Sequence, residues 1–166
     1  MISRLNNELF HGLLAKAAES SRKRSHYNFH ENEEDAVQRL CIALKQGTYV
    51  RPHQHTRKNK WELLLILSGA VNFVVFDNKG EIIEKLDLSL EGSQRGIEIK
   101  PNTWHTVYPT SDEAIILEVK EGPFTPTKES EFASWAPLEG QSGVDEFLRW
   151  LVSASVGEKY EKPNNT

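Results

Sequence analysis

Two histidines one residue apart, followed by a polar stretch and a carboxylate, constrain the fold of this chain more than any other feature. His53 and His55 share a face if their segment is extended, because alternate residues of a strand point the same way. Residues 57–60 are polar and predict a turn, after which Glu62 begins an apolar run. Such a hairpin brings two imidazoles and a carboxylate together, which predicts a site for a divalent metal ion.

Short strand patterns separated by turn signals fill the middle of the chain. They include AVQRLCIAL, WELLLILS, AVNFVVFD and AIILEVKEG, with Gly, Pro, Asn and Asp between them. TYVRPHQH is also expected to be a strand, with its proline at an edge or a bulge. About eight short strands predict a mainly β fold, a small antiparallel sandwich or barrel.

Helical patterns flank these strands. Residues 2–18 and residues 143–154 carry apolar side chains at the helical repeat, and we expect both helices to pack outside the β structure. A length of 166 residues favours one domain. We divide it into an N-terminal helix and arm (1–35), a β-barrel core (36–122) and a C-terminal extension with a short helix (123–166).

The composition argues against several classes of protein. A net charge of −4 disfavours a nucleic-acid partner, because phosphate contacts need a basic face. The single cysteine, Cys41, allows neither an intrachain disulfide nor a CxxC zinc motif, and it lies in an apolar run that predicts a buried thiol. No apolar run approaches the roughly 18 residues that span a bilayer. We expect a cytoplasmic protein with no membrane partner.

His105 is the natural candidate for a further metal ligand. It follows the turn at Asn102 and lies in a strand pattern, HTVYP, that a small antiparallel barrel can place beside the strand of His53. The set would then hold three imidazoles and one carboxylate. Without a thiolate, these ligands suit Fe, Mn, Ni, Co or Zn. We therefore expect one divalent metal ion per chain.

The same residues resemble the two motifs of the cupin superfamily. IKPNTWH is similar to the second motif, with Pro101 one place late and Asn102 where a glycine is usual. The first motif has a longer interval than usual before its glutamate and corresponds to Gly47, His53, His55, Glu62 and Gly69. The resemblance implies a cupin jelly roll whose metal ligands are His53, His55, Glu62 and His105. Cupins are commonly dimers, so we expect a homodimer.

A narrower resemblance covers nearly the whole chain. Five segments together look like the WbuC family of cupin-fold metalloproteins: RSHYNFH, VQRLCIAL, GTYVRPHQH, ILEVKEGPF and FASWAPLEG. The name of that family comes from bacterial O-antigen gene clusters. By association, the resemblance implies a role in lipopolysaccharide biosynthesis.

Candidate substrate-binding residues come from alternation along two segments. HYNFH places His26, Asn28 and His30 on one face, which would line a pocket at the barrel mouth or else lie on the surface. Tyr49 and Arg51 share the strand face predicted for His53, and Arg51 would either bind a carboxylate or a phosphate or be a solvated residue at the rim.

Three more residues have two open interpretations each. Trp104 would either stack on a sugar or pack in the core. Glu118 and Lys120 would be an inward acid/base pair, but their alternation with Ile115, Leu117 and Val119 favours an outward face. The candidates for catalysis are Tyr49, Arg51 and His30.

Three functions remain open for a metal site of this kind, each with a small-molecule ligand such as a sugar or a carboxylate. The first, which we favour, is a metal-dependent isomerase, epimerase or lyase acting on a sugar or sugar-nucleotide in bacterial surface polysaccharide synthesis. The second is an Fe(II)-dependent oxygenase of a small organic acid or thiol. The third is a non-catalytic, metal-bound binding module or sensor.

Overall fold

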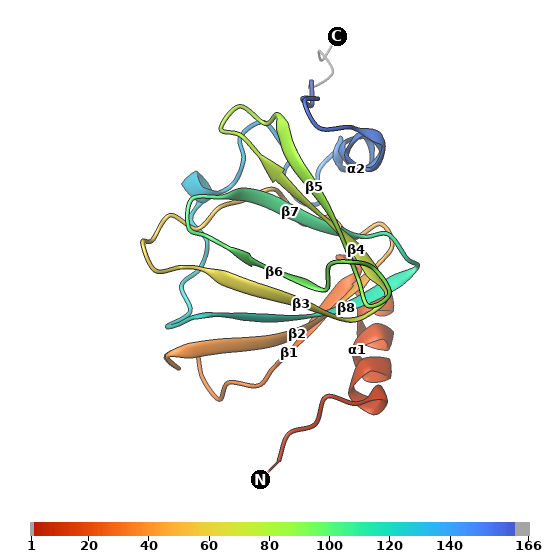
Figure 1. The fold of residues 1–166 in the computed structure, drawn as a ribbon, viewed down its shortest axis with the longest axis vertical. Coiled ribbons are helices and arrows are strands. Elements are labelled where there is room, and N and C mark those ends of the chain that lie inside the picture. The colour runs from red at the N-terminus through yellow and green to blue at the C-terminus, as the bar shows by residue number, and fades with distance from the viewer. Residues whose placement is uncertain (1, 162–166) are drawn as a thin grey trace.

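Eight strands and two α-helices form the chain in a computed structural model that describes residues 2–161 (Figure 1). In chain order the elements are α1 (Asn7–Glu19), β1 (Arg24–Asn28), β2 (Val37–Lys45), β3 (Glu62–Ser68), β4 (Ala70–Phe76), β5 (Ile82–Ser89), β6 (Gly96–Ile99), β7 (Trp104–Pro109), β8 (Glu113–Glu121), the 3-10 helix η1 (Glu129–Glu131) and α2 (Val144–Ser153).

The strands form two antiparallel sheets that face each other. One has five strands in the order β1-β2-β8-β3-β6, and the other has three in the order β5-β4-β7. Apolar residues of both sheets meet between them, including Leu64 and Ile116 from the large sheet and Phe73 and Val107 from the small one. The predicted antiparallel β fold is therefore confirmed.

Helix α1 covers the outer face of the five-stranded sheet. Asn6 caps the helix, since its side chain accepts a hydrogen bond from the backbone N–H of Leu9 (3.1 Å). Leu13 and Ala17 pack on Cys41 and Ile115, which point away from the space between the sheets. The cysteine is fully buried, as its apolar run predicted.

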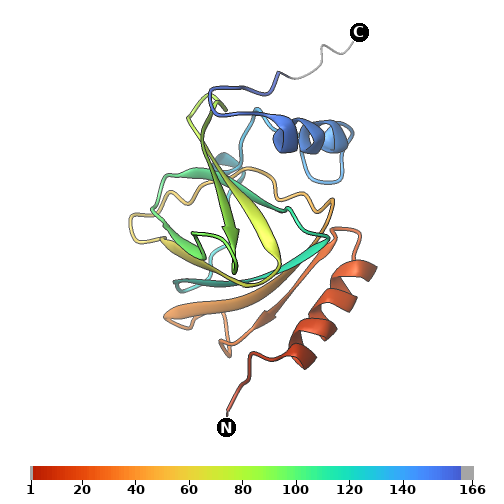
Figure 2. The same ribbon diagram turned by 45° about the vertical axis from the view of Figure 1, so that its right-hand side comes forward.

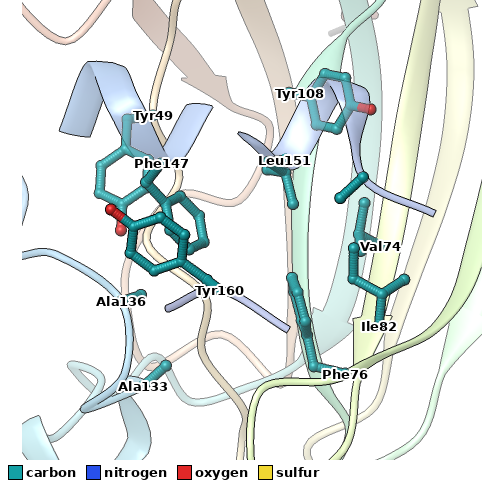
Figure 3. Close-up of a cluster of buried hydrophobic side chains, with 11 residues drawn as sticks. Tyr49, Val74, Phe76, Ile82, Tyr108, Ala133, Ala136, Phe147, Leu151 and Tyr160 are labelled. Atoms are coloured by element: carbon teal, nitrogen blue, oxygen red, sulfur yellow. The ribbon is translucent and has the colours of Figure 1, made fainter. Parts of the chain in front are cut away.

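The C-terminal extension covers the outer face of the three-stranded sheet. Phe147 and Leu151 of α2 pack against a buried cluster that includes Val74 and Phe76 of β4 and Tyr49 (Figure 3). Two views show α1 and α2 at different ends of the molecule (Figures 1 and 2). Both helices thus pack outside the sheets, as predicted.

The segment TYVRPHQH was expected to be a strand, and this prediction was wrong. Residues 48–56 follow an irregular path, and their one β-bridge position is His53, which pairs with His105 and with Phe132. Pro52 has no N–H to donate to a ladder, which breaks a continuous strand at this place. Residues inferred to share a face from strand alternation in this segment therefore need not do so.

The part of the chain that the structure describes contains no helix long and apolar enough to cross a membrane.

Replacing Phe147 by alanine tests how much the C-terminal extension contributes to the fold. Its side chain is fully buried and its ring lies 4.8 Å from that of Tyr160 and 5.4 Å from that of Trp150, centroid to centroid. We expect Phe147→Ala to lower the free energy of unfolding by about 3–5 kcal/mol, measured by urea denaturation. Val152→Ala, on the exposed side of the same helix, is the matched control. Equal losses in the two variants would contradict this packing.

Candidate metal centre

His53 and His105 are held next to each other by a two-way backbone pairing. The N–H of His53 donates to the carbonyl of His105 (3.0 Å), and the N–H of His105 donates to the carbonyl of His53 (2.9 Å). Their ring centroids are 4.4 Å apart. This pairing joins the irregular segment 48–56 to β7, so two histidines far apart in the sequence point into one space.

Glu62 completes the group together with His55. Glu62 is the first residue of β3, and its carboxylate lies 3.1 Å from Nε2 of His55 and 3.4 Å from Nε2 of His105. One ligand atom from each of the four residues lies within 4.8 Å of the other three. Glu62 and His105 are buried, and both His53 and His55 are half-buried.

The hydrogen bonds of the imidazoles suit metal ligation. Nδ1 of His53 lies 2.9 Å from the carbonyl of Arg51, and Nδ1 of His105 lies 2.8 Å from the carbonyl of Thr103. A carbonyl only accepts, so each Nδ1 carries the proton and each Nε2 keeps its lone pair. Nε2 of His55 is buried 3.1 Å from the Glu62 carboxylate but forms no hydrogen bond in this orientation. A divalent metal ion would give this orphaned atom a partner, and three imidazoles with one carboxylate fit such an ion.

The protonation states agree with this assignment. Burial, together with the neighbouring His105, lowers the pKa of His53 to about 3, so its imidazole is neutral. Burial alone would raise the pKa of Glu62. Its contacts with His105, His55 and Lys120 hold that pKa well below the usual range, and the carboxylate is ionised. Neutral imidazoles and an ionised carboxylate are the forms that bind metals.

A residue of the C-terminal extension holds the histidine-bearing segment from its other side. One carboxylate oxygen of Glu131 accepts from the backbone N–H (2.9 Å) and the hydroxyl (2.7 Å) of Thr56, and the other accepts from the N–H of Lys128 (2.9 Å). The carbonyl of Glu131 accepts from the N–H of Gln54. Burial by itself raises the pKa of Glu131, but these donors outweigh it and lower the pKa to about 2.

A cavity of about 350 Å³ opens from three of the four groups into the space between the sheets. His53, Glu62 and His105 form part of its wall. Apolar side chains line much of the remainder: Leu40, Ile42, Leu44, Val50, Leu64, Phe73, Val107 and Ile116. The arrangement places a ligand set at the side of a largely apolar chamber of small-molecule size.

The HYNFH segment lies as its alternation predicted. His26, Asn28 and His30 line the cavity, while Tyr27 and Phe29 pack edge to face on the other side of the segment with centroids 4.9 Å apart. Nδ1 of His30 accepts the backbone N–H of Arg39 (3.0 Å). In the neutral ring the proton is then on Nε2, which makes His30 a hydrogen-bond donor at the cavity.

The structure places Tyr49, Arg51 and Trp104 away from the cavity that the ligands line. The hydroxyl of Tyr49 donates to the carbonyl of Pro137 (2.7 Å), in the core beneath the C-terminal extension. Arg51 pairs with Glu129 (2.9 Å), and Trp104 donates from Nε1 to the side chain of Asn78 (3.1 Å). The first two were expected to share the face of His53, but their segment is irregular, so alternation did not apply.

Glu118 and Lys120 face the cavity, so the preference for an outward face was wrong. The apolar residues that alternate with them lie on the opposite face of β8, where Ile115 packs under α1. Nζ of Lys120 lies 2.6 Å from Glu118 and 3.4 Å from Glu62. Burial alone would lower the pKa of Lys120, but the carboxylates of Glu118 and Glu62 raise it above its usual value. The ammonium is therefore charged.

Replacing Glu131 by glutamine tests the role of this residue in holding residues 54–56. The amide has no charge and cannot accept from both Thr56 and Lys128 as the carboxylate does, so we expect a loss of about 2 kcal/mol in the free energy of unfolding at neutral pH. We also expect a lower affinity for Zn²⁺, measured by competition with a chelating dye. Glu84→Gln, on an exposed position of β5, is the control.

The stabilisation that Glu131 contributes should decrease as the pH falls. The pKa of Glu131 in the folded state lies below the ordinary value of 4.5, so its stabilisation is complete above that value and is lost as the pH falls toward about 2. The difference in unfolding free energy between wild type and Glu131→Gln should therefore shrink at about pH 3. A difference that stayed constant or grew in acid would contradict the role of the carboxylate.

The fold is similar to those of solved protein structures. Among solved structures, a cupin 2 conserved barrel domain protein from Rhodopseudomonas palustris superposes with a TM-score of 0.50 at 17% identity, over 75% of this chain and 78% of that one. A protein from Shewanella oneidensis superposes with a TM-score of 0.53 at 14% identity, over 74% of this chain and 81% of that one. These likenesses show the fold and leave the chemistry open.

Comparison with curated proteins found no match. The broader resemblance, to the cupin superfamily, is confirmed at the level of the fold, and the narrower one, to the WbuC family, stays a prediction. A family model described as a domain of unknown function matches residues 5–88, half of the chain. The protein thus has a cupin fold and belongs to the DUF6016 family.

Proposed function

We propose that this protein is a metal-dependent enzyme that acts on a small organic molecule held in the cavity beside the metal centre. One observation carries the proposal: three imidazoles and a carboxylate converge, and three of these four groups line a chamber of about 350 Å³ that also presents other polar groups. His30 and Asn28 reach the cavity from the β1 side, and Glu118 and Lys120 reach it from β8. A site built for structure alone has no need of such a chamber.

The bound ion would act as a Lewis acid toward an oxygen atom of the substrate. The side chains of the chain supply the rest. Apolar residues such as Phe73 and Leu64 exclude water from the cavity, which strengthens every electrostatic interaction inside it. Nε2–H of His30 donates a hydrogen bond and orients the substrate. Glu118 is a buried carboxylate whose pKa is raised by burial, which suits a group that takes up a proton.

The substrate we propose is a sugar or sugar-nucleotide, and the reaction an isomerisation, epimerisation or elimination. These reactions need a proton acceptor beside the substrate, and Glu118 faces the same cavity as the ligands. The resemblance to the WbuC family supports a role in bacterial surface polysaccharide synthesis. We also propose that the protein is a homodimer, as cupins commonly are, and that it is cytoplasmic.

Metal content of purified variants tests the ligand set. We expect the wild type to hold about one divalent ion per chain by elemental analysis, and His53→Ala and His105→Ala to lose it, because each removes one of only four ligands. His11→Ala, on an exposed position of α1, should keep the ion. Retention in either ligand variant would remove that residue from the set.

The affinity of the wild type for the metal should fall as the pH drops below about 6.5, the ordinary pKa of histidine, because protons then compete for the imidazoles of the unloaded protein. Equilibrium dialysis against Zn²⁺ between about pH 5 and pH 8 measures this. Occupancy unchanged in strong acid would contradict ligation by histidine.

A panel of sugars and nucleotide-sugars tests the reaction class. We expect one member to raise the melting temperature of the metal-loaded protein and to be converted only when metal is present. Absence of any effect across the panel would contradict the proposed substrate. Oxygen consumption after anaerobic loading with Fe(II) would instead indicate an oxygenase, and binding without turnover would indicate a binding module.

A further inference from the structure

A row of inward-facing polar groups crosses the five-stranded sheet next to the metal ligands. Gln38 of β2 is paired with Lys120 of β8, and Lys120 is paired with Glu62 of β3. All three line the cavity. Neighbouring strands are about 4.8 Å apart, so Lys120 is the first residue that a molecule extending from the metal centre along this row would meet.

Lys120 adjoins the ligand set directly. Its Nζ lies 3.4 Å from Oε1 of Glu62, the same oxygen that lies 3.1 Å from Nε2 of His55. On its other side Nζ lies 2.6 Å from Glu118. The side chains of Lys120 and Glu118 are only 19% and 13% exposed, so the ion pair faces the interior of the protein.

Metal binding changes the sign of the net charge of Lys120 and the two carboxylates beside it. With both carboxylates ionised, Glu62, Glu118 and Lys120 carry one net negative charge. A divalent ion brings the total to one net positive charge, and protonation of Glu118 would make it more positive. Glu62 then shares its charge with the metal, which leaves the ammonium of Lys120, paired on its other side with Glu118, next to a metal ion in a largely apolar chamber. Two neighbouring cations with little solvent attract an anionic oxygen group.

A carboxylate fits this site better than a phosphate does. Proteins commonly hold phosphate groups with arginine forks or with the backbone N–H groups of a helix N-terminus. Arg22 and Arg24 do reach the cavity wall, but both are paired with Glu139 (2.8 Å each). Helices α1 and α2 lie outside the sheets, away from the cavity. A single ammonium beside a metal ion matches the single charge of a carboxylate.

We propose that Lys120 and the metal centre bind one carboxylate group of the substrate between them, and that the substrate is therefore an organic acid, such as a sugar acid, rather than a neutral sugar. Glu118 is the positioning residue that keeps the ammonium at the edge of the ligand set. This inference rests on the proposed metal-dependent function and narrows its substrate class.

A matched pair of small probes tests the proposal. Glycolate and glycolamide have nearly the same shape, and only glycolate is charged. We expect Zn²⁺-loaded wild type to bind glycolate at least about tenfold more tightly than glycolamide by isothermal titration calorimetry, and the metal-free protein to lose most of that preference.

The variant that isolates Lys120 is the double substitution Glu118→Gln with Lys120→Met. Lys120→Met alone would leave the Glu118 carboxylate buried without a partner and could fail to fold, whereas the double variant removes both charges. We expect the double variant to bind Zn²⁺ as tightly as wild type or more tightly, because a repelling ammonium is gone, and to show a several-fold smaller preference for glycolate, since only the metal ion then attracts the carboxylate. Lys16→Met, on an exposed position of α1, removes one positive charge elsewhere and should keep the preference.

The outcomes separate the two proposals. Wild type that takes up no Zn²⁺ contradicts the metal-dependent function. Wild type that takes up Zn²⁺ but binds both probes equally overturns the carboxylate inference and leaves the metal centre in place. A double variant that prefers glycolate as strongly as wild type overturns the role of Lys120.

Discussion

The backbone pairing of His53 with His105 is the interaction on which the site depends. Residues 48–56 form no regular strand, so strand alternation does not fix the direction of their side chains. The two hydrogen bonds to β7 supply that direction on one side, and Glu131 of the C-terminal extension supplies it on the other. The extension is itself anchored by Phe147 and its neighbours on the small sheet. Packing far from the site therefore determines how well the ligands are held.

The second constraint is that the outer face of each sheet is covered by another part of the chain. Helix α1 and the C-terminal extension bury the outer faces, so apolar residues occur on both sides of a strand such as β8. Apolar residues then alternate along β8 whether Glu118 and Lys120 point inward or outward. The sequence pattern therefore does not distinguish the inner face from the outer one. These charges are buried against each other and against Glu62, and a cavity keeps them within reach of a ligand. The same strand thus contributes apolar residues to the core and charged residues to the cavity.

The sequence predicted the antiparallel fold, and the grouping of His53, His55 and Glu62, from local signals: residue type, spacing and turns. His105 joined that group through the expected barrel topology and the resemblance to the second cupin motif. The alternation of HYNFH, also a local signal, placed His26, Asn28 and His30 at the cavity. It failed for Tyr49 and Arg51, because Pro52 interrupts the strand that alternation presupposes. It failed for Glu118 and Lys120, because only the position of α1 decides which face of β8 is outside. Glu131 had no signal at all, since its partner Thr56 is distant in the sequence.

The central claim is that these four side chains together hold one metal ion. Crystals grown with Co²⁺ and measured at the cobalt absorption edge test it most directly. We predict a single strong anomalous peak per chain, about 2.0–2.2 Å from imidazole nitrogens of His53, His55 and His105 and from a carboxylate oxygen of Glu62. A peak elsewhere, or none at this site at saturating Co²⁺ and neutral pH, would contradict the account.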